Sequence, residues 1–346
     1  MTKRKYERGS EWRQWDLHVH SPASFHWGGV RFEPGGIDSE KNRELIDEMI
    51  AALNQAKPAV YAVMDYWTFD GWFALKKRLK EAGSPQLQKT IFPGIELRLA
   101  APTTCRLNAH VLFSDEVPDQ VLHDFKSTLE VEIIKSSLSD NALMELARTI
   151  SEDILKVHGI KKADVEHDDQ KALLAGAMVA EINCESYKKA IEKVPKGQAI
   201  GFMPYDTSDG LAEVKWQEHY AFFLGLFRSS PIFETRNIDR RCAFVGDETP
   251  GNAKWFKSFQ SALGFPKLAV SGSDAHCFVG QSGDNDKRGY GDFPSSKITW
   301  IKADPTFLGL CQAIREPSKR SFIGAKPPKL EEVDQNKTFF IERVEV

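Results

Sequence analysis

The sequence is poor in cysteine and contains no long hydrophobic segment. Its 346 residues include five cysteines, at positions 105, 184, 242, 277 and 311, and no two of them form a CxxC pair. This pattern argues against a zinc ribbon and a disulfide scaffold and is typical of the reducing cytosol. The longest apolar stretch, AFFLGLF, is far too short to cross a bilayer. We therefore expect a cytoplasmic protein with no membrane partner.

The charge balance and the absence of nucleotide-binding motifs exclude further classes. A net charge of −3 gives no strong overall field that would attract nucleic acid or a membrane, so any anion site must be local. The motifs GxGxxG, GxxxxGK[ST] and GxSxG do not occur. Their absence argues against the commonest doubly wound folds.

Short apolar runs alternate with helix-like segments along the chain. Helices are indicated at 39–56, where Ser39 is a start signal, at 70–83 and at 304–317. Strands are indicated at 15–20, 58–65, 89–100, 106–114, 199–204, 222–227, 231–235, 267–274 and 297–303. Such strands predict an α/β fold whose parallel sheet is covered by helices and closed or nearly closed into a barrel. Residues 117–195 indicate successive helices, either an insertion on the barrel or a small helical subdomain.

The segment DLHVHSPASFH near the start of the chain holds three of the nine histidines. Because side chains two apart on a strand share a face, Asp16, His18 and His20 should point one way and Leu17 and Val19 the other. A metal ion would satisfy two neighbouring imidazoles at once, and a nearby carboxylate would orient them. The plainer alternative is a pair of partly exposed histidines at a strand end.

Other metal-binding residue types occur at the ends of predicted strands. They are Asp65, Glu96, His110, Asp274 and His276. In a parallel barrel the carboxyl ends of the strands share one rim, where active sites form. Each residue alone has a structural explanation, such as an aspartate that caps a helix. Their joint occurrence beside apolar runs predicts a shared metal site.

These motifs resemble the PHP superfamily, named for polymerase and histidinol phosphatase. The resemblance covers about residues 14–320 and rests on DLHVHS, a third histidine at the expected interval (His26), PGIE, NAHVL and GSDAH. IFETRN resembles the family's late strand, which ends in a Glu and an Asn. The resemblance implies a distorted (β/α)7 barrel with a helical insertion, two or three divalent metal ions, and hydrolysis of phosphate esters.

Two departures from the family pattern bear on the metals. The second motif usually ends in Asp-His but reads Asp65-Tyr66 here, and a later strand usually ends in His-Pro but reads Met203-Pro204. A phenol or a thioether is a poor ligand for Zn²⁺ or Mn²⁺. Two ions therefore fit this sequence better than three. Asp65, Asp206 or a water could fill a gap, and Asp206 is favoured at the position of Met203 because it follows shortly after it in the chain. The ligands that the resemblance implies are His18, His20, His26, Asp65, Glu96, His110, Asp274 and His276.

By this resemblance the second ion site keeps Glu96 and His110 but loses the histidine that Met203 replaces, and the third ion site also loses one ligand. The third site would combine His26 and His276 with the histidine that Tyr66 replaces, so His26 is the ligand that we expect to lack full occupancy. Mixed nitrogen and oxygen ligands favour zinc, manganese or iron over magnesium. We expect Asp274, His276 and His110 to act in catalysis.

Basic residues near the predicted rim are candidates for binding substrate phosphate. They are Arg236, Arg240, Arg241, Lys287 and Arg288. Solvated surface charge is an equally good explanation for any single one.

The end of the chain, from KITWIKA onward, resembles the tail of PHP modules that precede an SMC- or ABC-like ATPase in bacterial antiphage proteins. We therefore expect a phosphoesterase domain at 1–325, with 117–195 as its insertion, and a tail or the start of an ATPase-linked domain at 326–346. The expected activity is that of a phosphodiesterase or nuclease in bacterial defence, with phosphate esters, nucleic acid included, as partners. A phosphomonoesterase on a small metabolite and a degenerate, non-catalytic binding module are the alternatives.

Overall fold

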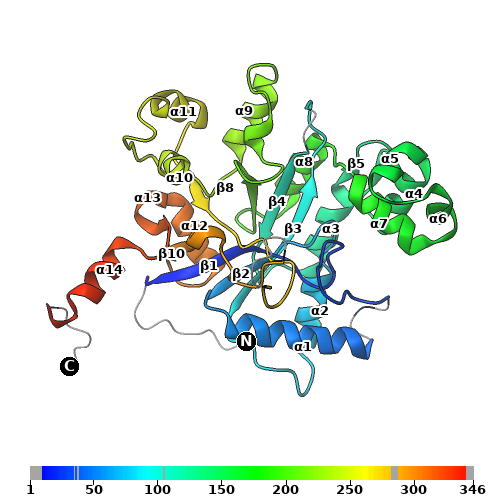
Figure 1. The fold of residues 1–346 in the computed structure, drawn as a ribbon, viewed down its shortest axis with the longest axis horizontal. Coiled ribbons are helices and arrows are strands. Elements are labelled where there is room, and N and C mark those ends of the chain that lie inside the picture. Colours follow the sequence, from blue (N-terminus) through cyan, green and yellow to red (C-terminus); the bar gives the residue numbers. More distant parts are fainter. Residues whose placement is uncertain (1–9, 35, 37–38, 104–105, 282–286, 340–346) are drawn as a thin grey trace.

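The protein combines one large sheet with surrounding helices (Figure 1). The computed structural model describes residues 10–34, 36, 39–103, 106–281 and 287–339. The strands are β1 (Trp12–Val19), β2 (Val60–Val63), β3 (Thr90–Arg98), β4 (Asn108–Phe113), β5 (Glu130–Val131), β6 (Ser136–Ser137), β7 (Ala199–Pro204), β8 (Ile232–Glu234), β9 (Leu268–Val270), β10 (Thr299–Lys302) and β11 (Ser321–Ile323).

The helices lie between these strands along the chain. The α-helices are α1 (Glu40–Gln55), α2 (Asp70–Arg78), α3 (Asp119–Thr128), α4 (Asp140–Thr149), α5 (Glu152–Val157), α6 (Lys162–His167), α7 (Asp169–Val179), α8 (Cys184–Lys193), α9 (Tyr220–Ser229), α10 (Ile238–Val245), α11 (Phe256–Leu263), α12 (Phe307–Arg315), α13 (Pro317–Arg320) and α14 (Pro328–Gln335). Short 3₁₀ helices are η2 (Leu211–Glu213), η3 (Pro294–Ser296) and η4 (Lys337–Phe339).

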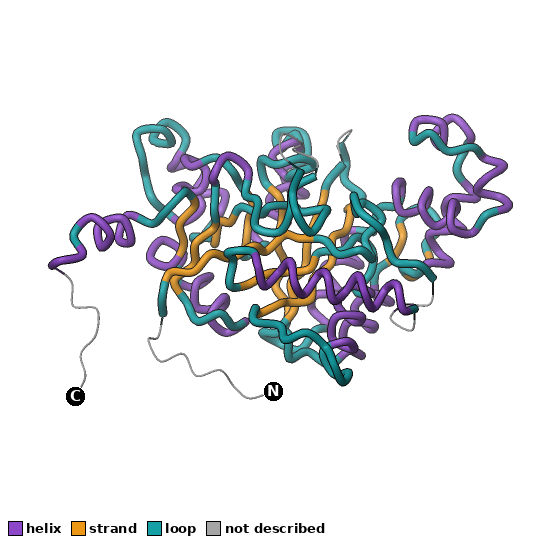
Figure 2. The backbone as a smooth tube through the Cα atoms, turned by 60° about the horizontal axis from the view of Figure 1, so that its bottom comes forward, coloured by secondary structure: helices purple, strands orange, loops and turns teal. Residues whose placement is uncertain are grey.

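Nine strands form one sheet that nearly closes on itself. Their order is β11-β10-β1-β2-β3-β4-β7-β8-β9. The segment after β9 returns to β1, where the amide of Asp274 donates to the carbonyl oxygen of His18 at 2.9 Å. The amide of Ser271 also donates to Oγ1 of Thr299 on β10, at 2.6 Å. The expected α/β fold with a nearly closed, barrel-like sheet is confirmed, and Figure 2 shows its strands gathered at the centre with helices around them.

The sheet is mixed rather than purely parallel. The parallel pairs are β1–β2, β2–β3, β7–β8 and β8–β9. β4 runs antiparallel to β3 and β7, and β10 runs antiparallel to β1 and β11. The link from Arg98 to Asn108 is shorter than the crossover of about a dozen or more residues that a parallel partner needs, so β4 turns back beside β3. The prediction of a parallel sheet is therefore wrong for these strands.

The interior of the barrel is apolar at one end. Side chains from β1, β2, β3, β4, β7, β8, β9 and β10 meet in one buried cluster, which α12 also joins. α12 follows a turn beside the first residue of β3, where Thr90 Oγ1 donates to the carbonyl oxygen of Pro305 at 2.8 Å. Apolar side chains therefore fill the end where the parallel strands begin. Polar side chains occupy the opposite end, where these strands finish.

The outer faces of the strands pack under helices. One buried cluster joins Tyr61 and Val63 of β2 to Ile46 and Met49 of α1. α1 begins as the sequence indicated, because Ser39 Oγ accepts a hydrogen bond from the amide of Asn42 and so satisfies a free donor of the first turn.

The most apolar run of the sequence forms a helix, so the strand expected at 222–227 is wrong. The run lies in α9, which buries Phe223, Leu226 and Phe227. This spacing of three and four residues places the buried side chains on one helix face. A short continuous apolar run does not by itself distinguish a buried strand from a buried helix. Within the described residues, every helix is too short or too polar to cross a membrane.

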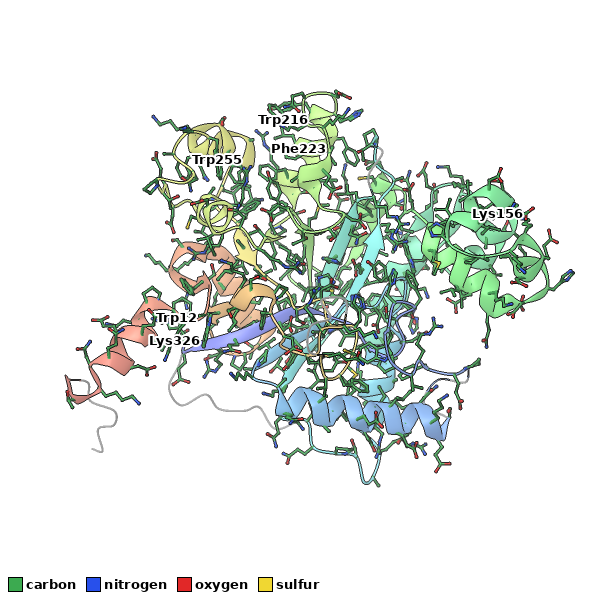
Figure 3. All side chains as sticks on the ribbon, in the orientation of Figure 1. Trp12, Lys156, Trp216, Phe223, Trp255 and Lys326 are labelled. Carbon is green, nitrogen blue, oxygen red and sulfur yellow. The ribbon has the colours of Figure 1, made fainter. Side chains whose placement is uncertain are left out.

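A helical lobe interrupts the sheet between β4 and β7. It contains α3 to α8, as expected for 117–195, together with the small β5–β6 pair. Figures 1 and 3 show α4 to α7 extending away from the sheet, with Lys156 on the lobe. Trp67 ties the lobe to the barrel, because its Nε1 donates to the carbonyl oxygen of Ala177 in α7 at 3.0 Å. The domain boundary at residue 325 stays a prediction; α14 and η4 follow it, and residues 340–346 lie outside the described residues.

Candidate metal centre

Six of the predicted ligands converge at the end of the barrel where the parallel strands finish. They are His18, His20, Glu96, His110, Asp274 and His276. Glu96 and His110 are direct partners across β3 and β4, which places their side chains next to each other. The backbone hydrogen bond between Asp274 and His18 brings the segment after β9 against β1. Strand pairing alone therefore assembles donors from four separate parts of the chain.

A register shift in β1 changes which side chains share a face. The pairing with β2 shifts between Asp16 and Val19. Leu17 and Val19 therefore lie in different hydrophobic clusters, and the prediction that they share a face is wrong. The buried carboxylate of Asp16 accepts hydrogen bonds from the amides of Ser273 at 3.0 Å and Gly291 at 3.1 Å. Asp16 thus fixes the segment after β9 to β1.

Three groups of donor atoms are compact enough to hold an ion. They are His18 with His20 and Glu96, His18 with His110 and Glu234, and His20 with Asp274 and His276, and the donor atoms of each group lie within 4.8 Å of one another. Oε2 of Glu96 lies 3.4 Å from Nε2 of His18 and 3.4 Å from Nε2 of His20, whereas Oε1 lies 3.2 Å from Nε2 of His110. Each oxygen of Glu96 therefore faces different histidines, which suits a carboxylate that bridges two ions.

Several imidazole nitrogens of the cluster lack hydrogen-bond partners within the described residues. Both ring nitrogens of His20 and of His110, and Nδ1 of His276, are buried without a hydrogen bond within the described part of the chain. Buried polar atoms without a partner are costly, and native proteins contain few of them. A divalent cation would accept these lone pairs, and the neighbouring carboxylates would offset its charge. The residues present therefore fit divalent metal ions.

The electrostatics of the cluster favour a bound cation. Burial alone would raise the pKa of Glu96, but the charges of His110 and His18 outweigh it and hold this pKa well below its usual value. Burial would also raise the pKa of Asp274, but the charge of His18 outweighs it and holds this pKa well below its usual value. Burial, with a smaller effect of His276, lowers the pKa of His20 to about 3. At neutral pH the cluster therefore offers ionised carboxylates and a neutral imidazole, which are the forms that bind metal.

Glu234 belongs to the site although the sequence-based ligand set omitted it. It is the last residue of β8, and its Oε2 lies 2.9 Å from Nδ1 of His18, with both side chains buried. Burial lowers the pKa of His18, but the charges of Glu234 and Asp274 outweigh it and raise this pKa well above its usual value. The sequence did carry a signal, because IFETRN resembles the family's late strand that ends in a Glu.

Asp65 lies beside the donor groups rather than within them. Its Oδ1 accepts from the amide of Ser21 at 2.7 Å, and its Oδ2 accepts from Ser21 Oγ at 2.5 Å. Its Oδ1 is also 4.0 Å from Nδ1 of His20. Burial raises the pKa of Asp65 to about 7. The position of Asp65 suits support of the His20 ring, and its role as a direct ligand stays a prediction.

His26 and the residues at the two departures from the family pattern do not belong to the donor groups found among the described residues. The exposed His26 accepts a hydrogen bond at its Nε2 from Arg98, at 3.4 Å. The hydroxyl of Tyr66 accepts from Nδ2 of Asn108 at 3.2 Å. Met203 is fully buried in the hydrophobic core. Asp206 is exposed and is absent from the three donor groups found among the described residues.

Two of the predicted substrate-binding cations lie at the cluster. Nη2 of Arg288 is 3.2 Å from Oδ2 of Asp274, and Nη2 of Arg236 is 3.9 Å from Oε1 of Glu234. Lys287 is exposed in the preceding loop and contacts Gln281.

The other two predicted substrate-binding residues, Arg240 and Arg241, lie in α10 and contact other parts of the protein. Arg241 is buried, and it donates to the backbone of β11 at Ser321 and pairs with Asp247 at 3.8 Å. The guanidinium carbon of Arg240 lies 4.1 Å from the ring centroid of Trp255, a residue labelled in Figure 3.

Comparisons with known proteins give distant likenesses. No protein-family model matches the chain, and no curated protein matches it. An amidohydrolase from Chromobacterium violaceum, solved with bound sulfate and no metal, is 15% identical, with a TM-score of 0.39, over 90% of this chain and 98% of that one. A candidate metal-dependent phosphoesterase from Bifidobacterium adolescentis is 13% identical, with a TM-score of 0.33, over 82% of this chain and 94% of that one.

A third solved structure is that of the lesion-specific endonuclease PfuEndoQ from Pyrococcus furiosus. It is 12% identical, with a TM-score of 0.43, over 90% of this chain. The chain spans 58% of the length of that endonuclease.

Proposed function

We propose that the chain is a metal-dependent phosphoesterase, and that a phosphodiesterase or nuclease is the form its site supports best. The observation that carries this proposal is the position of Glu96. Its two oxygens face three histidine nitrogens at 3.2–3.4 Å in a buried cluster. This arrangement suits a pair of divalent ions, and the mixed nitrogen and oxygen donors favour Zn²⁺, Mn²⁺ or Fe²⁺ over Mg²⁺.

When bound, a pair of divalent ions supplies an ionised water at neutral pH and positive charge for the attacking and leaving oxygens. The protein supplies the fixed geometry around it. Glu234 holds the ring of His18 through Nδ1, so that Nε2 faces Glu96 and Asp274. No side-chain nucleophile is required, and Asp274, His276 and His110 are the residues that we propose to act at the reacting water.

The side of the cluster that faces solvent carries positive charge. The side chain of Asp274 is 33% exposed and that of Arg236 is 32% exposed, whereas His18 and Glu96 are almost fully buried. Arg288 lies against Asp274 on this open side. Guanidinium groups bind phosphate oxygens in two-point contacts, so Arg236 and Arg288 are the residues that we propose to orient the phosphate. An open edge also admits a segment of a longer chain, which favours a diester.

The test is hydrolysis by purified protein supplied with Mn²⁺. Bis(p-nitrophenyl) phosphate, p-nitrophenyl phosphate, single-stranded DNA and single-stranded RNA would be compared at equal phosphate concentration. The proposal predicts cleavage of the diester and of nucleic acid, and loss of that activity in His20→Ala and Asp274→Asn. His167→Ala is the matched control, because His167 is exposed at the end of α6 in the helical lobe.

Each outcome has a defined meaning. Activity that persists in His20→Ala and Asp274→Asn would overturn the assignment of the site. If the protein cleaved only p-nitrophenyl phosphate, the phosphodiesterase proposal would be wrong and the phosphomonoesterase alternative would be supported. Bound metal without any cleavage would favour a binding module.

The resemblance of the segment from residue 297 onward extends the proposal to a cytoplasmic role in bacterial defence, linked to an ATPase domain. Phage plaque counts on cells with the wild-type protein or Asp274→Asn would test it. Equal plaque counts would contradict a defence role that depends on hydrolysis.

A further inference from the structure

A buried arginine lies beside the metal centre without an acidic partner. Arg98 is the last residue of β3, and only 3% of it is exposed. Its Nη1 donates to the carbonyl oxygens of Ala177 and Met178 in α7, at 3.2 and 2.6 Å. Within the described residues no carboxylate forms an ion pair with Arg98, and its Nε has no hydrogen-bond partner. A buried charge that forms no ion pair is costly.

The aromatic residues around Arg98 connect it to the metal cluster. The guanidinium carbon lies 5.2 Å from the ring centroid of Tyr66. Tyr66 stacks on His20 at a centroid distance of 5.6 Å, and His20 stacks on His276 at 4.2 Å. The guanidinium is therefore within the range of a cation–π contact with Tyr66, and this one aromatic ring separates it from His20, a predicted metal ligand.

Arg98 also contacts His26, the one predicted histidine ligand that the donor groups among the described residues leave out. Its Nη2 lies 3.4 Å from Nε2 of His26, whose ring is 6.0 Å from that of His276. The Arg98 guanidinium stays protonated at neutral pH and can only donate, so His26 is the acceptor of this hydrogen bond. The lone pair at Nε2 that would bind a metal is thus directed to a cation that is already present.

We propose that the Arg98 guanidinium takes the place of a metal ion beside His26, so that the centre holds ions only among the other histidines and carboxylates. This inference rests on the proposed metal-dependent function. Arg98 then supplies positive charge that does not depend on metal supply. The helical lobe holds this cation in place through the two carbonyl oxygens of α7.

The ion count of the whole protein tests the inference without reference to activity. Wild type, His26→Ala, His20→Ala and the control His167→Ala would be loaded with Mn²⁺ and analysed by calorimetric titration and elemental analysis. We expect at most two ions in wild type, and the same count and affinity in His26→Ala. His20→Ala should lose at least one binding step. His26 is exposed, so its replacement leaves the core packing in place.

A gain-of-site variant gives a second measurement. Tyr66→His alone should keep the wild-type count, because Arg98 still occupies the position beside His26. The double variant Tyr66→His with Arg98→Leu should gain one ion. An extra ion in Tyr66→His alone would overturn the inference, even if the double variant does not fold.

The results separate this inference from the proposed function. An ion lost in His26→Ala, or affinity lowered there by about tenfold or more, would overturn the role of Arg98 and leave the phosphoesterase proposal intact. The predicted ion counts without hydrolysis of any phosphate ester would contradict the proposed function alone. A wild-type protein that binds no ion would contradict both.

Discussion

Replacement of Glu234 by Gln tests whether the carboxylate of Glu234 holds the ring of His18 in place. The change preserves the shape of the side chain and removes its charge. In the wild-type protein Oε2 of Glu234 is 2.9 Å from Nδ1 of His18, and the two side chains are 2% and 7% exposed. A hydrogen bond to an ionised acceptor is roughly twice as strong as a neutral one. The variant should therefore retain the contact and lose much of its strength.

The expected size follows from the role of Glu234. Loss of a carboxylate that orients a metal-binding histidine typically lowers metal affinity by about 10- to 100-fold, which corresponds to about 1.4–2.7 kcal/mol. Glu96 and Asp274 remain within 3.4 Å of Nε2 of His18, so binding should weaken rather than disappear.

Calorimetric titration with Mn²⁺ at pH 7 and fixed ionic strength would measure this loss. Glu248→Gln is the matched control, because Glu248 is exposed in the segment after α10 and should bind metal as the wild type does. An affinity of Glu234→Gln within about twofold of the wild type would refute the reasoning, since it lies well below the expected range. An equal loss in the control would refute it as well.

Three further predictions concern stability. In Gly71→Ala the new Cβ would lie 2.0 Å from Ser21 Oγ and 2.3 Å from Oδ2 of Asp65. Urea denaturation should therefore show a free energy of unfolding lower by about 1–3 kcal/mol. In the control Gly225→Ala the new Cβ meets nothing within 4 Å, and the free energy of unfolding should not fall. Burial lowers the pKa of Lys267 to about 8 from its ordinary 10.5, so the unfolded chain binds more protons between these values and the free energy of unfolding should rise with pH there. Lys267→Met should abolish that rise, and parallel pH profiles would contradict the argument. Mn²⁺ at 100 times its dissociation constant should stabilise the protein by about 2.7 kcal/mol, and an unchanged melting temperature after chelation would contradict metal binding to the folded state.

The assembly of the metal centre was predictable because it depends on strand ends. His18 and Glu96 lie toward the carboxyl ends of β1 and β3, and the carboxyl ends of parallel strands meet at one rim. His110 lies on the antiparallel β4 and reaches the same rim as the cross-strand partner of Glu96. The sequence therefore indicated which parts of the chain would meet without any knowledge of side-chain positions. The ligands predicted from the sequence did not include Glu234. The reason is that β8 is only three residues long, and periodicity over three residues does not show where a carboxylate points.

The features that were missed depend on local geometry or on distant contacts. The register shift in β1 is invisible in an alternating pattern of apolar and polar residues, and it separates Leu17 from Val19. The short link before β4 could have indicated its antiparallel direction, but both directions bury an apolar strand equally well. The position of Arg98 depends on carbonyl oxygens of α7, about 80 residues further along the chain. No local pattern contains that contact.

Anomalous X-ray diffraction from Mn²⁺-soaked crystals tests the central claim most directly. We predict an anomalous peak about 2.0–2.3 Å from an oxygen of Glu96 and from histidine nitrogens of the same cluster, with His18 and His20 as the first candidates. We also predict no peak at Nε2 of His26. Crystals without a peak beside Glu96, or with peaks only elsewhere on the protein, would contradict the account.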